Sequence, residues 1–317
     1  MGELTLVTAF FDLGRGKWKG YERGNSKYLQ YFAHWATIRN NLIVYTEPQY
    51  ADEIMKIRKE FGREKQTKIV CIEDIYSYDK EIYDKIKNVM KNKYTWYFRY
   101  RLKTPECWNY KYNYIMALKS HFVIDAMKCG WAEGDIAWID FGFDHGGDNF
   151  RVEKEFDFLW KYDFSHHIHI GQERELDDRP IFNIVRNLTV YLRGNVIIAH
   201  DNLWVTFHKL LREAVLNLAA CGLADDDQTL MLMAYRAKPE LFKLHPWKTW
   251  GGMMSEFGGE PHTVIVPKQR NFQTFGKRCK RRIHQWWVEF DIRHRKGAEI
   301  NEKYYKDQII YWNNHDY

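Results

Sequence analysis

The 317-residue sequence lacks the marks of several protein classes. Only 20 glycines and 7 prolines interrupt it, which excludes collagen-like and low-complexity proteins. Its five cysteines are odd in number and never form a C-x-x-C pair, so neither a disulfide framework nor a zinc knuckle is expected. The motifs G-x-G-x-x-G and G-x-x-x-x-G-K-[ST] are also missing, which disfavours dinucleotide-dependent oxidoreductases and P-loop kinases.

Long hydrophobic runs are missing as well. No apolar stretch approaches the roughly 20 residues of a membrane span. The first residues enter a strand-like segment without a basic leader region, so we expect a cytoplasmic protein.

Aromatic residues are the unusual excess, at 17% of the chain with 13 Trp, 21 Tyr and 19 Phe. Such a content is typical of surfaces that stack on rings or lie at a membrane interface, and it favours a sugar, a base or a lipid-proximal ligand.

The net charge of +6 is unevenly placed. Residues 268–296 contain ten basic and two acidic side chains and carry +8, so the rest of the chain carries −2. This basic block, which includes Trp286 and Trp287, could lie on anionic lipid, hold a phosphate-bearing acceptor or bind nucleic acid. A solvated basic helix is the alternative.

Apolar runs alternate with amphipathic stretches, which is typical of parallel βα units. Strands are expected at residues 4–11, 42–46, 68–72, 135–140, 165–170 and 195–200. Helices are expected at 26–39, 48–61, 80–90, 106–128, 203–218 and 227–236, with irregular chain from there to about 259. The pattern predicts a single α/β domain over residues 1–265 and a basic helical region over 266–317.

The strand that ends at Asp140 carries the sharpest motif. In open α/β sheets ligands gather outside the carboxyl ends of strands, and here an apolar strand ends in an acid followed by Gly142. The Asp140 carboxylate could hold a divalent cation on a diphosphate, while Gly142 leaves room for the ligand. The alternative is that Asp140 caps the following turn.

A second acidic motif, Asp225-Asp226-Asp227, begins a predicted helix. Capping and the helix dipole explain two of these acids. A third adjacent carboxylate could act as a general base or stabilise an oxocarbenium ion, so Asp226 and Asp227 are candidate catalytic residues.

The end of the first strand and its loop form a third candidate site, where a nucleotide would dock. Arg15 could bind a phosphate there, and Phe10 or Phe11 could stack on a base. The alternative, which is favoured for Phe10, is a place in the strand core followed by an ordinary loop. Among the late histidines, His245 and His262 are candidate metal ligands, although a lone histidine is more often structural.

Four segments together resemble the HtrL/YibB family. They are TLVTAFFDLGR at 5–15, NLIVYT at 41–46, WIDFG at 138–142 and DDQ at 226–228, in the same order over about residues 3–245. That family resembles GT-A type glycosyltransferases and is associated with genes for bacterial surface polysaccharide and lipopolysaccharide core. The resemblance implies a GT-A-like, Rossmann-like domain with a mixed, mainly parallel sheet.

The resemblance also implies roles for individual residues. Asp140 corresponds to the first acid of a D-x-D site for a metal and the donor diphosphate, and Gly142 stands where the second acid would be. Thr8, Ala9, Phe10 and Arg15 would contact the donor nucleotide. Lys119 matches a basic position of GT-A enzymes, although a surface lysine is the simpler explanation.

The function that the resemblance implies is transfer of a hexose from a nucleotide sugar, most simply a UDP-sugar, to a cell-surface glycan. Mn²⁺ or Mg²⁺ would be the cofactor, held by Asp140 with His262 as a further candidate ligand. The partners would be a glycan or lipid-linked glycan acceptor and the inner face of the cytoplasmic membrane, with no nucleic acid expected. A nucleic-acid-binding protein and a GT-A fold that has lost catalysis are the alternatives.

Overall fold

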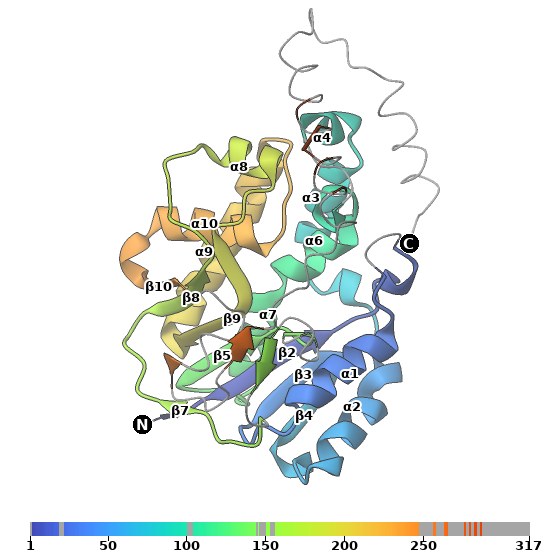
Figure 1. Ribbon diagram of the computed structural model, residues 1–317, viewed down its shortest axis with the longest axis vertical. Coiled ribbons are helices and arrows are strands. Elements are labelled where there is room, and N and C mark those ends of the chain that lie inside the picture. Colours follow the sequence, from blue (N-terminus) through green and yellow to red (C-terminus); the bar gives the residue numbers. More distant parts are fainter. Residues whose placement is uncertain are drawn as a thin grey trace, which may run out of the picture.

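The computed structural model describes residues 2–18, 22–99, 104–143, 145, 150–152, 156–246, 256–257, 263–265, 276, 279, 282–283 and 286. These residues form an α/β fold around one large sheet (Figure 1). The predicted basic region over 266–317 lies almost entirely outside the described residues, so its boundary stays a prediction.

Seven strands make the central sheet. Their spatial order is β10-β8-β9-β5-β2-β3-β4. Their bounds are β2 Thr5–Phe10, β3 Leu42–Thr46, β4 Thr67–Cys71, β5 Asp135–Ile139, β8 Ile168–Gln172, β9 Leu192–His200 and β10 Phe242–Pro246. Strand β9 runs antiparallel to β5 and β8, and the other neighbouring pairs are parallel. The predicted mixed, mainly parallel sheet is therefore confirmed.

Short strands form two further pairs. Strand β1 (Gly2–Glu3) pairs with β7 (Lys161–Tyr162), and β6 (Phe150–Val152) pairs with β11 (Thr263–Ile265), both antiparallel.

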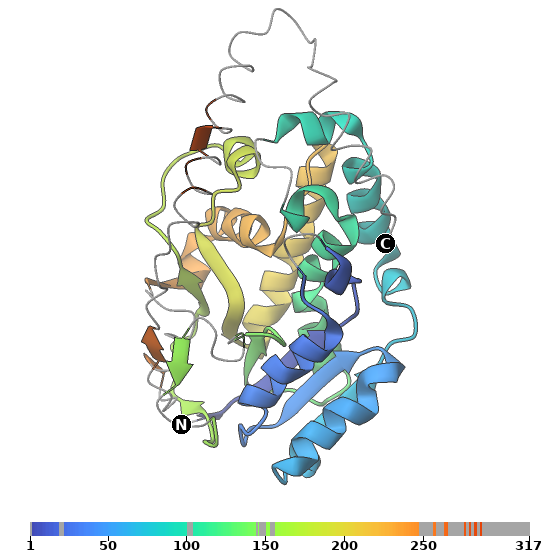
Figure 2. The ribbon, with the colours of Figure 1, turned by 45° about the vertical axis from the view of Figure 1, so that its right-hand side comes forward.

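The helices cover both faces of the sheet (Figure 2). Their bounds are α1 Asn25–Trp35, α2 Pro48–Glu60, α3 Lys80–Met90, α4 Lys93–Phe98, α5 Pro105–Trp108, α6 Tyr110–Ala117, α7 Lys119–Lys128, α8 Ile181–Asn187, α9 Asp201–Ala220 and α10 Asp227–Ala237. Short 3₁₀ helices lie at Arg15–Lys17 (η1), Glu64–Gln66 (η2), Ile75–Ser77 (η3) and Pro239–Leu241 (η5). None of the described helices is both long enough and apolar enough to cross a bilayer.

Two hydrophobic clusters hold these layers together. Side chains alternate between the faces of a strand, so Leu6 and Val7 enter different clusters. Leu6 packs with α1 and α2, whereas Val7 packs with α3, α6, α7, α9 and α10. Both faces are buried, which explains why these strands read as continuous apolar runs.

Several predicted elements differ from the observed ones. The helix expected over 106–128 is divided into α5, α6 and α7, with breaks near Asn109 and Leu118. Helix α1 begins at Asn25 and its N-cap is Gly24, so Ser26 is not the cap as predicted. Strand β10 was missed because its residues, FKLHP, do not form an apolar run, and pairing with β8 decides their conformation.

The strand order places a topological switch at β2. From β2 the chain builds outward through β3 to β4, then returns to the other side of β2 as β5. In open α/β sheets the crevice at such a point, outside the carboxyl ends of the strands, is where ligands bind. A functional site is therefore expected at the carboxyl ends of β2 and β5.

Candidate functional site

A cleft of about 360 Å³ opens at the carboxyl ends of β2 and β5. Its volume lies in the range of small-molecule sites. The predicted site residues that line it are Ala9, Phe10, Arg15, Lys119, Asp140, Gly142, Asp226 and Asp227. Thr8 is completely buried and does not line the cleft, and His245 on β10 is buried next to His169 on β8 instead. His262 lies outside the described residues.

Asp140 directly follows β5 and points its carboxylate into the cleft. Oδ1 accepts hydrogen bonds from Trp138 Nε1 at 2.8 Å and from the Lys119 ammonium, also at 2.8 Å. The Asp140 backbone N–H donates to the carbonyl of Asn195 on β9. The side chain keeps 33% of its surface exposed, so its carboxylate is held on one side and open on the other.

Lys119 is a buried lysine and not the surface lysine of the simpler alternative. The residue is 3% exposed, at the first position of α7. Its Nζ lies 2.8 Å from Asp140 Oδ1, 2.7 Å from Asp227 Oδ2 and 2.9 Å from the Gly194 carbonyl. An ammonium has three N–H donors, and all three are used within the protein. The two carboxylates outweigh the cost of burial and raise the Lys119 pKa, so the side chain stays charged.

Asp227 comes close to the sheet because β9 has a glycine opposite it. A Cβ at Gly194 would lie only 1.9 Å from Asp227 Oδ2 and 2.9 Å from Met231 Cε. Only glycine therefore leaves room for the Asp227 carboxylate in this position. Burial raises the Asp227 pKa, while Lys119 partly offsets this effect.

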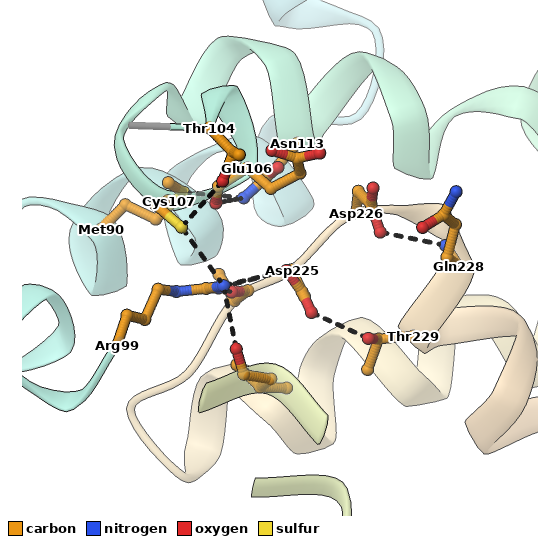
Figure 3. A network of polar contacts seen from close by, with 12 residues as sticks. Met90, Arg99, Thr104, Glu106, Cys107, Asn113, Asp225, Asp226, Gln228 and Thr229 are labelled. Carbon is orange, nitrogen blue, oxygen red and sulfur yellow. Dashed lines mark hydrogen bonds and ion pairs between the residues drawn. The ribbon is translucent and has the colours of Figure 1, made fainter. Parts of the chain in front are cut away.

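The other two acids of the triple-aspartate motif have different partners (Figure 3). Asp225 forms a buried ion pair with Arg99 at 3.2 Å and accepts a hydrogen bond from Thr229 Oγ1 at 2.8 Å. Asp226 is the N-cap of α10 and accepts from the Gln228 N–H at 3.2 Å. Among the described residues no cation contacts Asp226, unlike its two neighbours.

Asp226 therefore holds its negative charge at a high free-energy cost. Burial and the charges of Asp227, Asp225 and Glu106 raise its pKa well above the ordinary value. Glu106, on α5, lines the same end of the cleft, and burial raises its pKa too. Its Oε2 atom is buried without a hydrogen-bond partner in the described part of the chain. This acidic end of the cleft is suited to take up a proton or to bind hydroxyl groups.

A second part of the cleft lining, its basic end, carries two arginines. The Arg15 guanidinium lies 5.5 Å from the Trp18 ring centre and 5.9 Å from those of Tyr28 and Tyr112, and it donates to Tyr28 Oη at 2.7 Å. Arg23 reaches His145 Nε2 at 3.2 Å on the same lining. Arginines held in this way are suited to bind phosphate oxygens.

Tyr112 lies close to both sets of charged side chains. Its ring faces Arg15, while burial and the charges of Glu106 and Asp226 raise its pKa far above the ordinary value.

Phe10 lines the cleft, but it belongs to the packed core. It is 5% exposed, and its ring stacks on Phe141 with centroids 4.8 Å apart. Stacking on a base would therefore use only the edge of Phe10 that the cleft leaves open. Tyr28, whose ring is 5.7 Å away, offers a second aromatic surface beside Arg15.

The described residues do not form a metal centre by themselves. A Cβ at Gly142 would lie 3.1 Å from Tyr28 and 3.3 Å from Tyr31, so the place of a second acid is packed against α1. Asp140 Oδ1 is bound by Lys119 and Trp138, and no three His, Cys, Asp or Glu side chains of the described chain converge on one point. Divalent cations favour several oxygen ligands and are disfavoured beside a fixed ammonium.

Sequence reasoning missed several residues of the cleft. Those that line it without having been singled out include Arg23, Asn25, Tyr28, Glu106, Tyr112, Gly194, Asn195 and Gln228. Arg23 follows the Gly-rich, basic loop after the first strand, which was a usable signal. Glu106, Tyr112 and Gly194 carry no local signal, because only the packing of α5, α6 and β9 brings them to the cleft.

Comparison with known proteins identifies relatives in sequence. Residues 2–257 match the sequence model of a family described as "Bacterial protein of unknown function (HtrL_YibB)". Protein HtrL of Escherichia coli (strain K12) is 31% identical over 252 residues, which cover 76% of this chain and 87% of that protein.

The similarity to solved structures is weaker than the similarity in sequence to these relatives. Mouse xyloside xylosyltransferase 1 in its apo form has a TM-score of 0.38 at 14% identity, covering 81% of this chain and 93% of that chain. The PaToxG glycosyltransferase has a TM-score of 0.35 at 12% identity, covering 75% and 70%. A glycosyltransferase involved in glycosylation of the major capsid of PBCV-1 scores 0.33 at 9% identity, covering 90% and 99%. Scores this low give no argument for a shared activity.

Proposed function

The chain belongs to the HtrL_YibB family, and we propose that it is a glycosyltransferase. It would move a hexose from a nucleotide sugar, a UDP-sugar, to a hydroxyl group of a bacterial surface glycan. The observation that carries the proposal is a single cleft at the switch point of the sheet with one basic and one acidic end. Residues to which the family resemblance points, among them Arg15 and Asp227, line both the basic and the acidic end of the cleft.

The basic end supports binding of the donor. A nucleotide diphosphate is anionic and aromatic, and Arg15, Arg23 and Tyr28 offer it two guanidinium groups and a ring. Ala9 and Phe10, at the end of β2, lie at the position where nucleotides dock in open α/β sheets. The alternative of a fold without catalysis predicted no pocket beside Asp140, and the cleft argues against it.

The acidic end supports the chemistry. In the proposed reaction an acceptor oxygen bonds to the anomeric carbon while the bond from that carbon to the diphosphate oxygen breaks. The bonding electron pair leaves with the nucleoside diphosphate, and the hydroxyl proton passes to a carboxylate. Asp226 is the best base, because its pKa is raised and no described cation holds it. Asp227, held by Lys119, would supply negative charge near the anomeric carbon.

The role of Mn²⁺ or Mg²⁺ stays a prediction. Asp140 has an open side toward the cleft, but the described residues beside it do not complete a cation site. Docking of a lipid-linked or phosphorylated acceptor by the basic block, at the inner face of the cytoplasmic membrane, is likewise part of the proposal. Lipopolysaccharide core and capsule are the acceptor classes that the family resemblance suggests.

A panel of nucleotide sugars tests the proposal. Thermal unfolding would be followed with each donor and with its free nucleotide, because a ligand that binds only the folded state raises the melting temperature. A rise with UDP and UDP-hexoses in the wild type, and a smaller one in Arg15→Gln, is expected. The absence of any shift with every donor would overturn the assignment and favour a binding protein.

A further inference from the structure

Lys119 holds together two acids that line the cleft, Asp140 and Asp227. Asp140 comes from the end of β5 and Asp227 from the start of α10, and each places one carboxylate oxygen within 2.8 Å of the same Nζ. Without the ammonium, two carboxylates would face one buried point at the edge of the cleft. Such a pair repels itself, so it is stabilised by a cation between its members or by a shared proton.

The position that would make this pair a metal site is closed. Gly142 stands where a second acid would follow Asp140, and Tyr28 and Tyr31 fill the space that its side chain would need. The only described cation that contacts both acids is therefore Lys119, which is 3% exposed and already donates to a third acceptor, the Gly194 carbonyl.

From this arrangement we infer that Lys119 is the built-in cation of the site, filling the place that a bound divalent metal would take between Asp140 and Asp227. Lys119 is thus a positioning residue that acts through the two aspartates. Its three N–H groups are all used by the protein, so it does not hold the donor phosphates directly. The donor phosphates would then be bound by Arg15 and Arg23.

Two consequences can be measured on the free protein without an assay of enzyme activity. The wild type should bind no Mn²⁺ at this point, because the ammonium occupies it. Lys119→Met should gain a Mn²⁺ site, because removing the ammonium leaves two carboxylates facing each other. Lys119→Arg keeps a positive charge and should gain none.

Mn²⁺ binding would be measured by electron paramagnetic resonance on the full chain without nucleotide, together with the melting temperature. Lys119→Met should bind Mn²⁺ and regain thermal stability in its presence, whereas the wild type should do neither. The matched control is Lys128→Met, an exposed lysine at the other end of α7, which should behave as the wild type. Mn²⁺ binding by the wild type between these acids, or none by folded Lys119→Met, would overturn the inference.

A second measurement uses only the wild type and therefore does not depend on a variant that folds. Calorimetric titration with UDP is done in excess EDTA and again with Mn²⁺. Since the cation is built in, the two affinities should agree within about twofold, well below the tenfold that 1.4 kcal/mol represents. A loss of affinity of about tenfold or more in EDTA would overturn the inference and leave the proposed function standing.

This part of the inference rests on the proposed donor site. If the wild type binds no UDP under either condition, the proposed function fails, and with it the role of Lys119 toward the donor. The Mn²⁺ measurement on the free protein then separates the two failures, because it does not involve a nucleotide.

Discussion

Lys119 and Asp227 are 108 residues apart in the sequence, and their side chains meet at 2.7 Å inside the protein. One is the first residue of α7 and the other the first residue of α10. This pair joins the end of β5, through Asp140, to the acidic end of the cleft. Negative charge thus lies on both sides of one ammonium, at the point where the proposed donor and acceptor would meet.

Exchange of Asp226 for Asn should separate catalysis from helix capping. Asn caps a helix about as well as Asp, so Asp226→Asn should keep its melting temperature close to that of the wild type. The transfer rate should nevertheless fall by about 10²–10⁴-fold, because the amide cannot take up a proton. Binding of UDP, measured by calorimetry, should stay nearly unchanged.

Asp227→Asn is the variant with which Asp226→Asn is compared. It removes the charge from one partner of Lys119, so both the rate and the stability should fall. If Asp226→Asn transfers sugar at the wild-type rate, Asp226 is only a cap.

Gly194→Ala should disturb the site by a single methyl group. The added Cβ would lie 1.9 Å from Asp227 Oδ2, so the Asp227 carboxylate must leave its place beside Lys119. We expect a loss of about 1–3 kcal/mol of unfolding free energy in urea denaturation, the usual cost of overpacking. Gly276→Ala, where nothing lies within 4 Å, is the control and should cost little. An unchanged stability and rate in Gly194→Ala would contradict the close approach of Asp227.

The His169 side chain should make the protein less stable in mild acid. Burial lowers its pKa to about 4, against 6.5 for an exposed histidine, and the hydrogen bond to the Ser165 carbonyl only partly opposes this. As the pH falls from 6.5 to 4, this histidine therefore becomes protonated in the unfolded chain but stays neutral in the folded chain. Stability due to this group is complete above pH 6.5 and is lost across that window.

Urea unfolding of the wild type and His169→Gln at pH 7 and pH 5 measures the effect. The wild type should lose up to about 1.4 kcal/mol more per pH unit than the variant. His245, 3.0 Å away, also has a lowered pKa and adds to the slope in both proteins. His166→Gln, at an exposed position, is the control, and an equal slope in His169→Gln and the wild type would be evidence against the buried neutral ring.

The basic block should bind anionic membranes. Replacing Arg278, Lys280, Arg281 and Arg282 by Gln should weaken sedimentation with phosphatidylserine-containing vesicles, by about 1 kcal/mol for each cation near the surface. Added salt should mimic the substitution, because exposed charges are screened within about 8 Å at physiological ionic strength.

A control with the same change in net charge separates the block from general electrostatics. The exposed lysines 56, 59, 65 and 80 would be replaced by Gln instead, and vesicle binding should persist. Absence of vesicle binding in the wild type, together with a clear shift of a labelled oligonucleotide, would favour the nucleic-acid alternative.

Local sequence signals predicted most of the fold. Strand β3 and helix α3 begin and end at the predicted residues, because each is bounded by strong signals such as the Asp79 cap of α3. Strand β10 could not be predicted, since its residues become a strand only by pairing with β8, some 70 residues earlier in the chain.

The sequence by itself determined the local positions of single acids, with Asp140 after an apolar strand and Asp226 before a helix. Both positions could be predicted because strand ends and helix caps depend on neighbouring residues. Only the tertiary structure decided which acid has a partner. Lys119 looked like a surface lysine until α7 and α10 packed against β5 and β9, and no local signal marked Gly194. The reason is physical: periodicity and capping act over a few residues, whereas the charge balance of a buried site depends on side chains that only packing brings together.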